Sequence, residues 1–454
     1  MPPFNTVPGS ARGQGSERDH LHLMPLDSLF RVAILLGFML VFILSIHWRV
    51  FQPLLHAAVE HEWTRFIVHP SILWMIMGFL MLFFRTLLWF RYRTPPIASL
   101  DDAPSLTVII PAYNEGPMVS QSIDSVAAAH YPREQLEIFV VDDGSRDDTW
   151  EHIEAAAKRY PGLVTTLRFT QNRGKRAALE AGFRHARGDV IVTIDSDSVI
   201  ESNSLLAMAG PFRDAKVGAV AGRVAVYNRA QGLIPRMLKV RYTLSFDYLR
   251  AVQSTYGTVC CCPGALAGYR ASVVRKVLDE WVNQKFMGVA CTYGEDRSMT
   301  NYILAQGYDT VYQRAAVVHT VVPQTYSRLC KMFLRWDRSY VREEIRFARI
   351  VWKRPPAARA IAVADAIVTN LRYPVGWGAL VLLVAIIIWH PATLVRFICA
   401  IGIMASFNML YYLRSERSWD FIYGIFYSYY SAFALFWIFP YAVVTVRAKS
   451  WLTR

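Results

Sequence analysis

The sequence predicts an α/β domain with a parallel, Rossmann-like sheet, flanked on both sides by hydrophobic segments long enough to cross a membrane. Of the 454 residues, 54% are hydrophobic and only 19% are charged, which is too apolar for an ordinary soluble protein. The hydrophobic residues are concentrated before residue 92 and after residue 373. Between these positions short apolar runs alternate with helical stretches, a pattern that is typical of α/β domains.

The N-terminal part combines a polar tail with two apolar runs. Residues 1–28 are rich in Pro, Gly and polar groups, and we expect them to be disordered. Residues 29–48 are just long enough to cross a bilayer, and no small-residue cleavage site follows them, which favours an anchor over a signal peptide. The second run, 72–90, is interrupted only by Arg85, whose long stem can reach an interface or another helix. Residues 29–92 are therefore predicted to hold two transmembrane helices.

The C-terminal part, residues 357–454, is predicted to be a second transmembrane region. Its apolar runs are 377–389, 395–413 and 421–446. Basic residues flank the last run on both sides, so the positive-inside rule places both of its ends in the cytoplasm. Because Pro440 interrupts this run, we expect a re-entrant hairpin or a pair of short tilted helices instead of one span. Arg91 and Arg93 mark a cytoplasmic exit before the central domain.

Charge and cysteine content narrow the classes of partner. The 49 Lys and Arg against 35 Asp and Glu give a formal net charge of +14, which suits nucleic acid, an acidic membrane surface or an anionic substrate. Membrane attachment favours the last two, and we expect no nucleic-acid partner. The six cysteines show no CxxC pair and no His at zinc-finger spacing, so we expect reduced thiols that pack as small hydrophobes.

Two segments combine basic residues with Leu, Met, Phe and Trp in an amphipathic pattern. They are residues 233–252, within a possible interface helix at 232–256, and residues 326–352, within a predicted helix at 324–356. Such helices lie in the membrane interface or turn an ordinary apolar face toward a protein core. The pattern leaves both alternatives open.

Acidic and amide side chains follow three of the four predicted strands. The strands are 106–110, 136–141, 164–169 and 190–194. The side chains at their carboxyl ends are Asn114 and Glu115 after the first, Asp142 and Asp143 after the second, and Asp195 and Asp197 after the fourth. Ligands of parallel sheets bind at this edge, so we expect these groups to meet in one crevice.

So many acids in one crevice are costly unless a cation, hydrogen-bond donors or solvent compensate them. A metal-bound diphosphate with its sugar and base is therefore a natural occupant. Asp195 and Asp197 suit a hard divalent ion that bridges phosphate oxygens. Lys175 lies in a basic stretch, 172–176, at the start of the third helix, where it can meet phosphate or acidic groups. A surface charge run is the alternative, and a Walker A loop is excluded by the missing first Gly and Ser/Thr.

A further acidic pair, Glu295 and Asp296, opens a helix at residues 293–305. Asp296 can act as a general base if it lies beside an acceptor hydroxyl. The alternative is a helix cap that pairs with Arg297. Arg335 and Trp336 offer a cation for phosphate and a flat indole face for a sugar ring, although an amphipathic helix contains such residues anyway.

Taken together, these motifs resemble family 2 processive glycosyltransferases, the group of hyaluronan, chitin, cellulose and rhizobial chitooligosaccharide synthases. The resemblance covers residues 105–340. Its markers are PAYNE at 111–115, VDDGSRDDT at 141–149, DSD at 195–197, GEDR at 294–297 and RW at 335–336. The stretches that begin at Asp296 and Arg335 are most similar to hyaluronan synthases, whereas CCCPGALAGYR at 260–270 is more similar to the chitooligosaccharide enzymes.

The resemblance implies a GT-A fold for residues 93–323, with Mg²⁺ or Mn²⁺ as cofactor. The implied metal ligands are Asp195 and Asp197, and the implied catalytic groups are the base Asp296 with Glu295. The implied donor- and acceptor-binding residues are Asn114, Glu115, Asp142, Asp143, Lys175, Asp195, Arg297, Arg335 and Trp336. Of these, Asp142 and Asp143 are expected near the uridine, Arg335 at the diphosphate and Trp336 at the acceptor.

One position departs from the family pattern. The motif QxxRW requires Gln where this chain has Met332, so the contact made by that amide must be absent or supplied by another group. This departure bears on the acceptor and the product, and it leaves the carboxylate chemistry unchanged.

The resemblance implies a processive inverting β-glycosyltransferase of the plasma (inner) membrane with a cytoplasmic catalytic domain. Its expected partners are a UDP-sugar donor, a growing polysaccharide and the lipid bilayer, with secretion through its own channel. The sugar that the resemblance favours for this donor is N-acetylglucosamine, with or without glucuronic acid. Synthesis of a chitooligosaccharide or another β-linked homopolymer is one alternative, and transfer to a lipid acceptor is another. A catalytically silent scaffold is disfavoured because Asp195, Asp197 and Asp296 are all present.

Overall fold

The computed structural model describes residues 16–47, 52, 56, 59–60 and 65–448. They belong to two compact units. One unit comprises Met1–Leu73 and Val375–Ile425, and the other comprises Trp74–Pro374 and Phe426–Arg454. Three helices, α3 (Arg65–Arg91), α13 (Pro356–Trp389) and α15 (Phe421–Ala434), contribute to both units.

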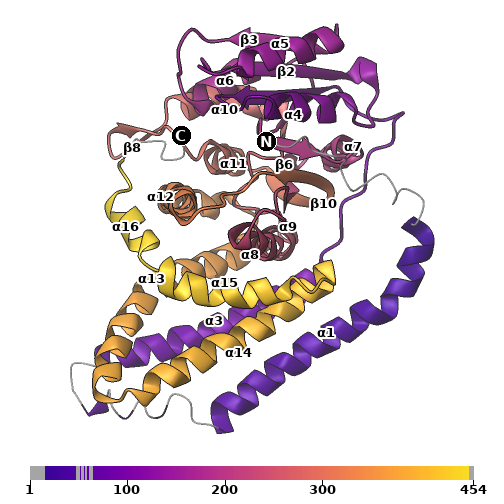
Figure 1. Ribbon diagram of the computed structural model, residues 1–454. Coiled ribbons are helices and arrows are strands. Elements are labelled where there is room, and N and C mark those ends of the chain that lie inside the picture. The colour runs from indigo at the N-terminus through magenta and orange to yellow at the C-terminus, as the bar shows by residue number, and fades with distance from the viewer. Residues whose placement is uncertain (1–15, 48–51, 53–55, 57–58, 61–64, 449–454) are drawn as a thin grey trace. The chain divides into compact units, whose positions relative to one another are not determined.

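The first unit is built around the contact between α1 (Ser16–His47) and α14 (Ala392–Glu416) (Figure 1). Phe38 meets Phe407 edge-on with 4.8 Å between ring centroids. A side chain at Gly37 would approach the Phe407 ring to 2.8 Å, so the glycine allows the two helices to pack closely. At one end of the pair, Asp27 accepts from Arg31 at 2.7 Å and from Arg414 at 2.8 Å.

Among the described residues, three helices are long and apolar enough to cross a membrane. Their bounds are Asp27–Leu44, Pro356–Trp389 and Ala392–Glu416. A fourth candidate is the bent pair of α15 and α16 (Ile438–Val444), which meet at 49°. The break lies at residues 435–437, and Pro440 is inside α16. The predicted run 72–90 lies within α3.

The helix α1 begins earlier than expected. It starts at Ser16 and so includes half of the stretch that composition assigned to a disordered tail. The physical reason is that Glu17, Arg18, Leu21 and Leu23 favour helix formation in spite of the local polarity. Residues 1–15 of the predicted tail lie outside the described residues.

The second unit contains an eight-stranded mixed sheet in the order β3-β2-β1-β4-β7-β6-β10-β5. The strands are β1 (Leu106–Ala112), β2 (Leu136–Asp142), β3 (Val164–Arg168), β4 (Val190–Thr193), β5 (Ser198–Ile200), β6 (Val217–Val226), β7 (Ala267–Arg270) and β10 (Asp309–Thr320). The first four are parallel, as predicted, with Leu106 opposite Leu136 and Val190. Strand β7 runs antiparallel between β4 and β6, and β10 is parallel to β6, so β3 and β2 lie at one side of the sheet and β6 and β10 at the other (Figure 1).

Helices cover both faces of the sheet. They are α4 (Met118–Ala127), α5 (Thr149–Arg159), α6 (Lys175–His185), α7 (Ser204–Ala209), α10 (Ala271–Val282) and α11 (Glu295–Ala305). In β2, Ile138 and Val140 join the cluster with α4 and α5, whereas Phe139 and Val141 pack with Ala178 of α6 on the other face. Short elements complete the domain: η2 (Arg133–Gln135), η3 (Gly210–Arg213), η5 (Val351–Lys353), β8 (Lys285–Phe286) and β9 (Val289–Ala290).

Both amphipathic segments are helical, and both bury an apolar face inside the protein. The first comprises α8 (Leu233–Tyr242), the π-helical turn η4 (Thr243–Leu249) and α9 (Arg250–Ser254). The second is α12 (Tyr326–Ile350), whose Phe333 shares a cluster with Leu238 of α8. Leu233 and Tyr326 are exposed at the outer ends of the two segments. The core-facing alternative therefore describes most of the apolar side chains of these helices.

Arg85, the charge inside the second apolar run, pairs with another helix. Its Nε lies 2.5 Å from Asp365 Oδ1, and its Nη2 donates to Thr369 Oγ1 at 2.5 Å. Both charged side chains are largely buried, with 15% and 11% of their surface exposed. Removal of either partner would leave a charge without compensation in an apolar setting, which ties α3 to α13 within this unit.

Candidate active site

The loop after β1 is held to the segment after β2 by hydrogen bonds from backbone N–H groups to side-chain hydroxyls. The backbone N–H of Asn114, a residue in the left-handed region with φ 54°, donates to Ser145 Oγ at 3.0 Å. The backbone N–H groups of Glu115 and Gly116 both donate to Thr149 Oγ1 at 2.8 Å. The PAYNE and DDGSRDDT motifs therefore form one rigid rim at the carboxyl edge of the sheet.

The two acids after β2 are buried and hold this rim in shape. Asp142 is fully buried, accepts from the Ser145 backbone N–H at 3.1 Å, and lies 3.2 Å from Arg168 Nε. Asp143 accepts from the backbone N–H groups of Arg173 at 2.7 Å and Gly174 at 2.8 Å. Burial raises the pKa of Asp143. Of the two partners expected for the 172–176 stretch, phosphate or an acidic group, its backbone N–H groups thus bind an acidic one, Asp143.

A cavity of about 440 Å³ opens beside this rim. It is lined by Gly144, Ser145, Arg146, Arg168, Phe169, Thr170, Gln171 and Asn172. The Phe169 ring and the polar groups around it could hold a planar base with its ribose. Asp142 and Asp143 hold two parts of this lining in place, because they accept hydrogen bonds from Ser145 and from the 172–174 loop.

Lys175 joins the carboxylates of two distant segments. Its ammonium donates to Asp195 Oδ1, at the end of β4, and lies 3.3 Å from Glu295 Oε1, at the start of α11. Burial alone would lower the pKa of Lys175, but the two carboxylates outweigh it and raise the pKa above its ordinary value. Lys175 therefore stays charged and is the cation of this crevice rather than part of a surface charge run.

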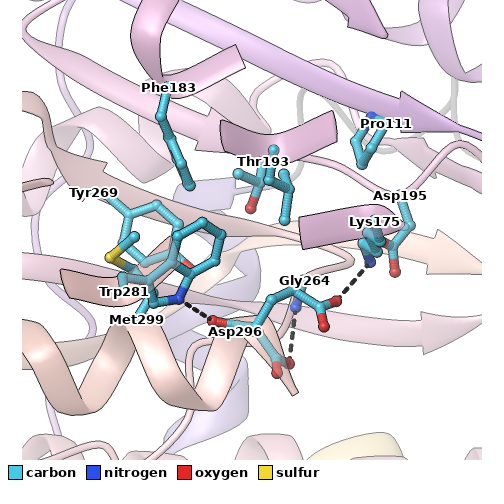
Figure 2. Close-up of a pocket in the computed structure, with 12 residues that line it drawn as sticks. Pro111, Lys175, Phe183, Thr193, Asp195, Gly264, Tyr269, Trp281, Asp296 and Met299 are labelled. Atoms are coloured by element: carbon cyan, nitrogen blue, oxygen red, sulfur yellow. Dashed lines mark hydrogen bonds and ion pairs between the residues drawn. The ribbon is translucent and has the colours of Figure 1, made fainter. Parts of the chain in front are cut away.

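Figure 2 shows this group around a small pocket of about 10 Å³, enough for about one water molecule. The polar side is formed by Lys175, Asp195, Glu295 and Asp296. The opposite side is apolar and is formed by Phe183, Tyr269, Trp281 and Met299, together with Leu179. Four ionisable groups from three segments thus meet above an apolar floor, where electrostatic interactions are stronger than in water.

Asp296 lies in the first turn of α11, and its carboxylate accepts three hydrogen bonds. Oδ2 accepts from the Gly264 backbone N–H at 3.2 Å and from the Cys261 thiol at 3.6 Å. Oδ1 accepts from the Arg297 backbone N–H at 2.7 Å. Burial raises the pKa of Asp296, and the neighbouring Glu295 carboxylate raises it further. A buried carboxylate with a raised pKa is a better proton acceptor, which suits a general base.

The helix-cap alternative for Asp296 does not describe this geometry. The residue that precedes α11 is Gly294, in the left-handed region with φ 75°, and no side chain caps the helix. The Arg297 guanidinium pairs with Glu344 at 2.9 Å and stacks on the Tyr340 ring at 4.9 Å. The Asp296 carboxylate therefore faces Gly264 and Cys261 and not the Arg297 guanidinium.

Arg335 and Trp336 come to the same region from α12. The positive charge of Arg335 contributes to the lowered pKa of Glu295, after the larger contribution of Lys175 that opposes burial. Trp336 is 39% exposed, and its ring lies 6.2 Å from that of Tyr242 and 5.7 Å from that of Phe333. This aromatic group offers a flat, partly open surface of the kind that sugar rings bind.

Asp197 lies two residues after Asp195 and has its own partners. Its Oδ1 accepts from Ser198 Oγ at 3.2 Å and from Thr320 Oγ1 at 3.3 Å. In the described part of the chain, no three His, Cys, Asp or Glu side chains form a complete metal site. Two carboxylates on one loop nevertheless fit a hard divalent ion that takes its remaining ligands from phosphate oxygens and water.

Met332, the departure from the family pattern, is buried away from the pocket. It is 5% exposed, and the Tyr242 hydroxyl contacts its sulfur at 4.0 Å. We expect Met332→Gln to change the rate of UDP release by less than about threefold and to cost about 1 kcal/mol of stability, because an amide replaces a thioether of similar volume in a buried place. Steady-state assays and thermal unfolding test this. A tenfold change in the KM of the donor would show that residue 332 acts on the substrate.

Four residues of the site were missed by sequence reasoning. They are Cys261, Gly264, Arg168 and Glu344. The CCCPG stretch was used only to compare products, although its Pro-Gly turn is the kind of segment that lets a backbone N–H approach an acid. Nothing in the sequence around Arg168 and Glu344, apart from their charge, indicated that they belong to the site.

A second cavity, of about 120 Å³, lies on the other side of Cys261 and Arg297. All of its lining residues belong to the second unit, and they come from α3, η4, α9 and the turn after it, α11, α12, α13 and the CCCPG loop. Its charged lining residues are Arg85, Arg250, Arg297, Glu344, Asp365 and Arg372. The cavity therefore combines charged side chains with a largely apolar wall, part of which α3 and α13 form.

Comparison with known proteins agrees with this geometry. Residues 107–278 match Glycosyl transferase family 2. The chain contains a family 2 glycosyltransferase domain. The resemblance inferred from the motifs is thereby confirmed, and the family 2 domain includes the rim, Lys175, both acids of the DSD motif and the CCCPG loop.

Named relatives cover the same region. The N-acetylglucosaminyltransferase of Rhizobium meliloti (strain 1021) is 37% identical over 242 residues, which is 53% of this chain and 56% of that protein. The hyaluronan synthase of Streptococcus pyogenes is 35% identical over 258 residues, or 56% of this chain and 61% of that protein. The chain thus spans little more than half the length of the curated relatives that it matches.

A solved structure shares the fold. Mannosyltransferase PcManGT from Pyrobaculum calidifontis, in complex with GDP-Man and Mn²⁺, aligns over 80% of this chain and 98% of its own, with a TM-score of 0.59 and 22% identity. The predicted GT-A class of the family 2 domain, with helices apolar enough to span a membrane on either side in sequence, is confirmed.

Proposed function

We propose that the protein is a membrane-bound, metal-dependent, inverting glycosyltransferase that extends a β-linked polysaccharide from UDP-sugars. The observation that carries this proposal is the convergence of Asp296, Glu295, Lys175 and Asp195 at the carboxyl edge of the sheet. A protonatable carboxylate, a permanent cation and a carboxylate for a metal are the groups that transfer from a nucleotide diphosphate requires. The names of the two relatives support N-acetylglucosamine as one donor sugar.

In the proposed reaction Asp296 removes the proton of the acceptor hydroxyl as that oxygen attacks C1 of the donor sugar. Attack opposite the departing UDP inverts this carbon and gives a β linkage. Lys175 and Arg335 stabilise the negative charge that develops on the diphosphate, and Trp336 supports the acceptor ring. Asp195 and Asp197 would hold Mg²⁺ or Mn²⁺, which acts as a Lewis acid toward the leaving diphosphate.

Processive elongation and secretion are part of the proposal. The 120 Å³ cavity carries six charged side chains, lies next to Asp296 through Cys261, and has α3 and α13 in its wall, which supports a path for a growing chain. Orientation follows from the basic residues around the apolar helices, which favour a cytoplasmic catalytic domain in the plasma (inner) membrane.

The test is UDP release by detergent-purified protein with Mg²⁺ or Mn²⁺. UDP-N-acetylglucosamine, UDP-glucuronic acid and UDP-glucose are offered singly and in pairs, with a metal-chelated control. We expect release with UDP-N-acetylglucosamine, loss of at least about 90% of the rate on chelation, and recovery on addition of the metal. Silence with every donor contradicts the proposal, and an undiminished rate after chelation contradicts its metal dependence.

Product analysis then separates the alternatives. High-mass material that needs two donors identifies a heteropolymer synthase, and material from one donor identifies a homopolymer or oligosaccharide enzyme. Single-sugar glycolipids would instead identify transfer to a lipid and overturn processivity.

A further inference from the structure

Glu343 is a fully buried carboxylate in α12 that no step of the proposed reaction uses. Its side chain is 0% exposed, and it lies about two helical turns after Trp336. Its Oε1 accepts from Gln284 Nε2 at 2.8 Å and from Arg342 Nε at 3.1 Å. Its Oε2 accepts from Asn301 Nδ2 at 3.1 Å. One carboxylate thus joins the segment after α10, the middle of α11 and α12 itself.

The partners of Glu343 also hold the first turn of α11, where the proposed base lies. Gln284 Oε1 accepts from Ser298 Oγ at 2.5 Å. Arg342 Nη2 donates to the carbonyl oxygen of Tyr293, in the loop that enters α11. Both ends of this turn are therefore connected to Glu343 through a single intervening side chain.

A second contact makes the distance between the two helices rigid. The Asn301 amide donates to the backbone carbonyl of Glu343 at 2.9 Å in addition to its carboxylate. Because Asn301 lies on α11 and Glu343 on α12, sliding of one helix past the other would break both bonds together. A fully bonded polar network in a buried place specifies one geometry, whereas apolar packing tolerates small shifts.

We infer that Glu343 is a positioning residue that sets the distance between the base on α11 and the Arg335–Trp336 pair on α12. This inference rests on the proposed function, since it assumes that α11 supplies the base and α12 binds the diphosphate and the acceptor. Displacement of a reacting group by about 1 Å costs about 10²-fold in rate. Loss of the Glu343 connections should therefore impair transfer without removing any group that touches the substrate.

The experiment compares Glu343→Gln and Asn301→Ala with a matched control, Glu280→Gln. Glu280 lies on α10, and its side chain is exposed, so this variant makes the same chemical change outside the network. The measurements are kcat and KM for the donor, the ratio of sugar transferred to the acceptor over sugar released to water, and the thermal midpoint of each full-length, detergent-purified protein.

We expect Glu343→Gln to lower kcat for transfer about 10- to 100-fold with the donor KM within about threefold of wild type. The ratio of transfer to hydrolysis should fall, since a displaced acceptor competes less well with water. Asn301→Ala, which leaves no charge unpaired, should show the same pattern more weakly. The double variant should lose no more than Glu343→Gln alone, because both changes break one connection.

The outcomes separate this inference from the function on which it rests. A wild-type protein that releases no UDP with any donor contradicts both. Wild-type turnover together with an unchanged transfer-to-hydrolysis ratio in Glu343→Gln and Asn301→Ala contradicts the inference alone. So does a fall in kcat that only follows the fraction of folded protein, since that would mark a purely structural role. Should Glu343→Gln fail to fold, Asn301→Ala and its ratio decide the question.

Discussion

Asp296→Asn is expected to lower kcat for UDP release about 10³-fold while the donor KM stays within about threefold of wild type. Asn has nearly the same shape, and its amide oxygen can still accept from Gly264 N–H and the Cys261 thiol. The contacts to Gly264 and Cys261 are therefore kept, whereas the group that takes the acceptor proton and the Arg297 N–H bond to Oδ1 are lost. Steady-state UDP release under saturating donor and metal measures the effect.

A control variant makes the same change of charge without touching the site. Asp279→Asn alters an acid on α10 that is 82% exposed and pairs with Arg184 on the surface. We expect it to keep the wild-type rate, because an exposed pair of this kind contributes little. If Asp296→Asn turns over as fast as Asp279→Asn, the base is a different group.

The raised pKa of Asp296 gives the reaction and the fold opposite pH dependences. As a base the residue must be ionised, so the rate should fall as the pH decreases through a pKa above the ordinary value of 3.8. Stability behaves in the reverse sense. Because the pKa is higher in the folded state, ionisation between the ordinary and the raised value costs stability. Asp296→Asn should therefore melt at a higher temperature than wild type at neutral pH, which differential scanning measures.

The sequence located the carboxyl edge of the sheet because strand ends obey a local rule. Buried β-branched runs followed by Asp or Asn mark the ends of β1, β2 and β4, and parallel strands bring such ends together. Lys175 was identified because a cation at a helix start can meet phosphate, and Asp296 because an acid beside an acceptor hydroxyl can act as a general base. The structure brings both to Asp195 and Glu295.

The remaining features depend on contacts that have no local signature. Strand β7 inserts between β4 and β6 although it lies far from both in the chain, and no periodicity encodes such a pairing. The use of backbone donors by Asp143 depends on how its loop closes. Gln284, Asn301 and Glu343 read as ordinary polar residues of amphipathic helices, and only tertiary packing turns them into one buried network.

Gly294→Ala is expected to impair both stability and catalysis through one atom. Gly294 has φ 75°, a conformation that costs an alanine about 1–2 kcal/mol. A Cβ there would lie 1.9 Å from Ser339 Oγ and 2.9 Å from Arg342 Nη2, so α12 would have to move away from the loop that presents Asp296. Overpacking adds about 1–3 kcal/mol to the cost. Since α12 also carries Arg335 and Trp336, we expect kcat to fall about 10²-fold.

Gly307→Ala separates the backbone cost from the displacement of α12. Gly307 has φ 88°, just beyond the end of α11, and an added Cβ would meet no atom within 4 Å. The variant Gly307→Ala should lose about 1–2 kcal/mol of stability. It should keep its kcat, because the distance between Asp296 and Trp336 does not change. Ser339→Gly in the Gly294→Ala background should restore part of the rate, since it removes the atom that the new methyl group meets. Equal kcat values for Gly294→Ala and Gly307→Ala would show that catalysis tolerates a shift of α12, and would argue against a fixed spacing between the two helices.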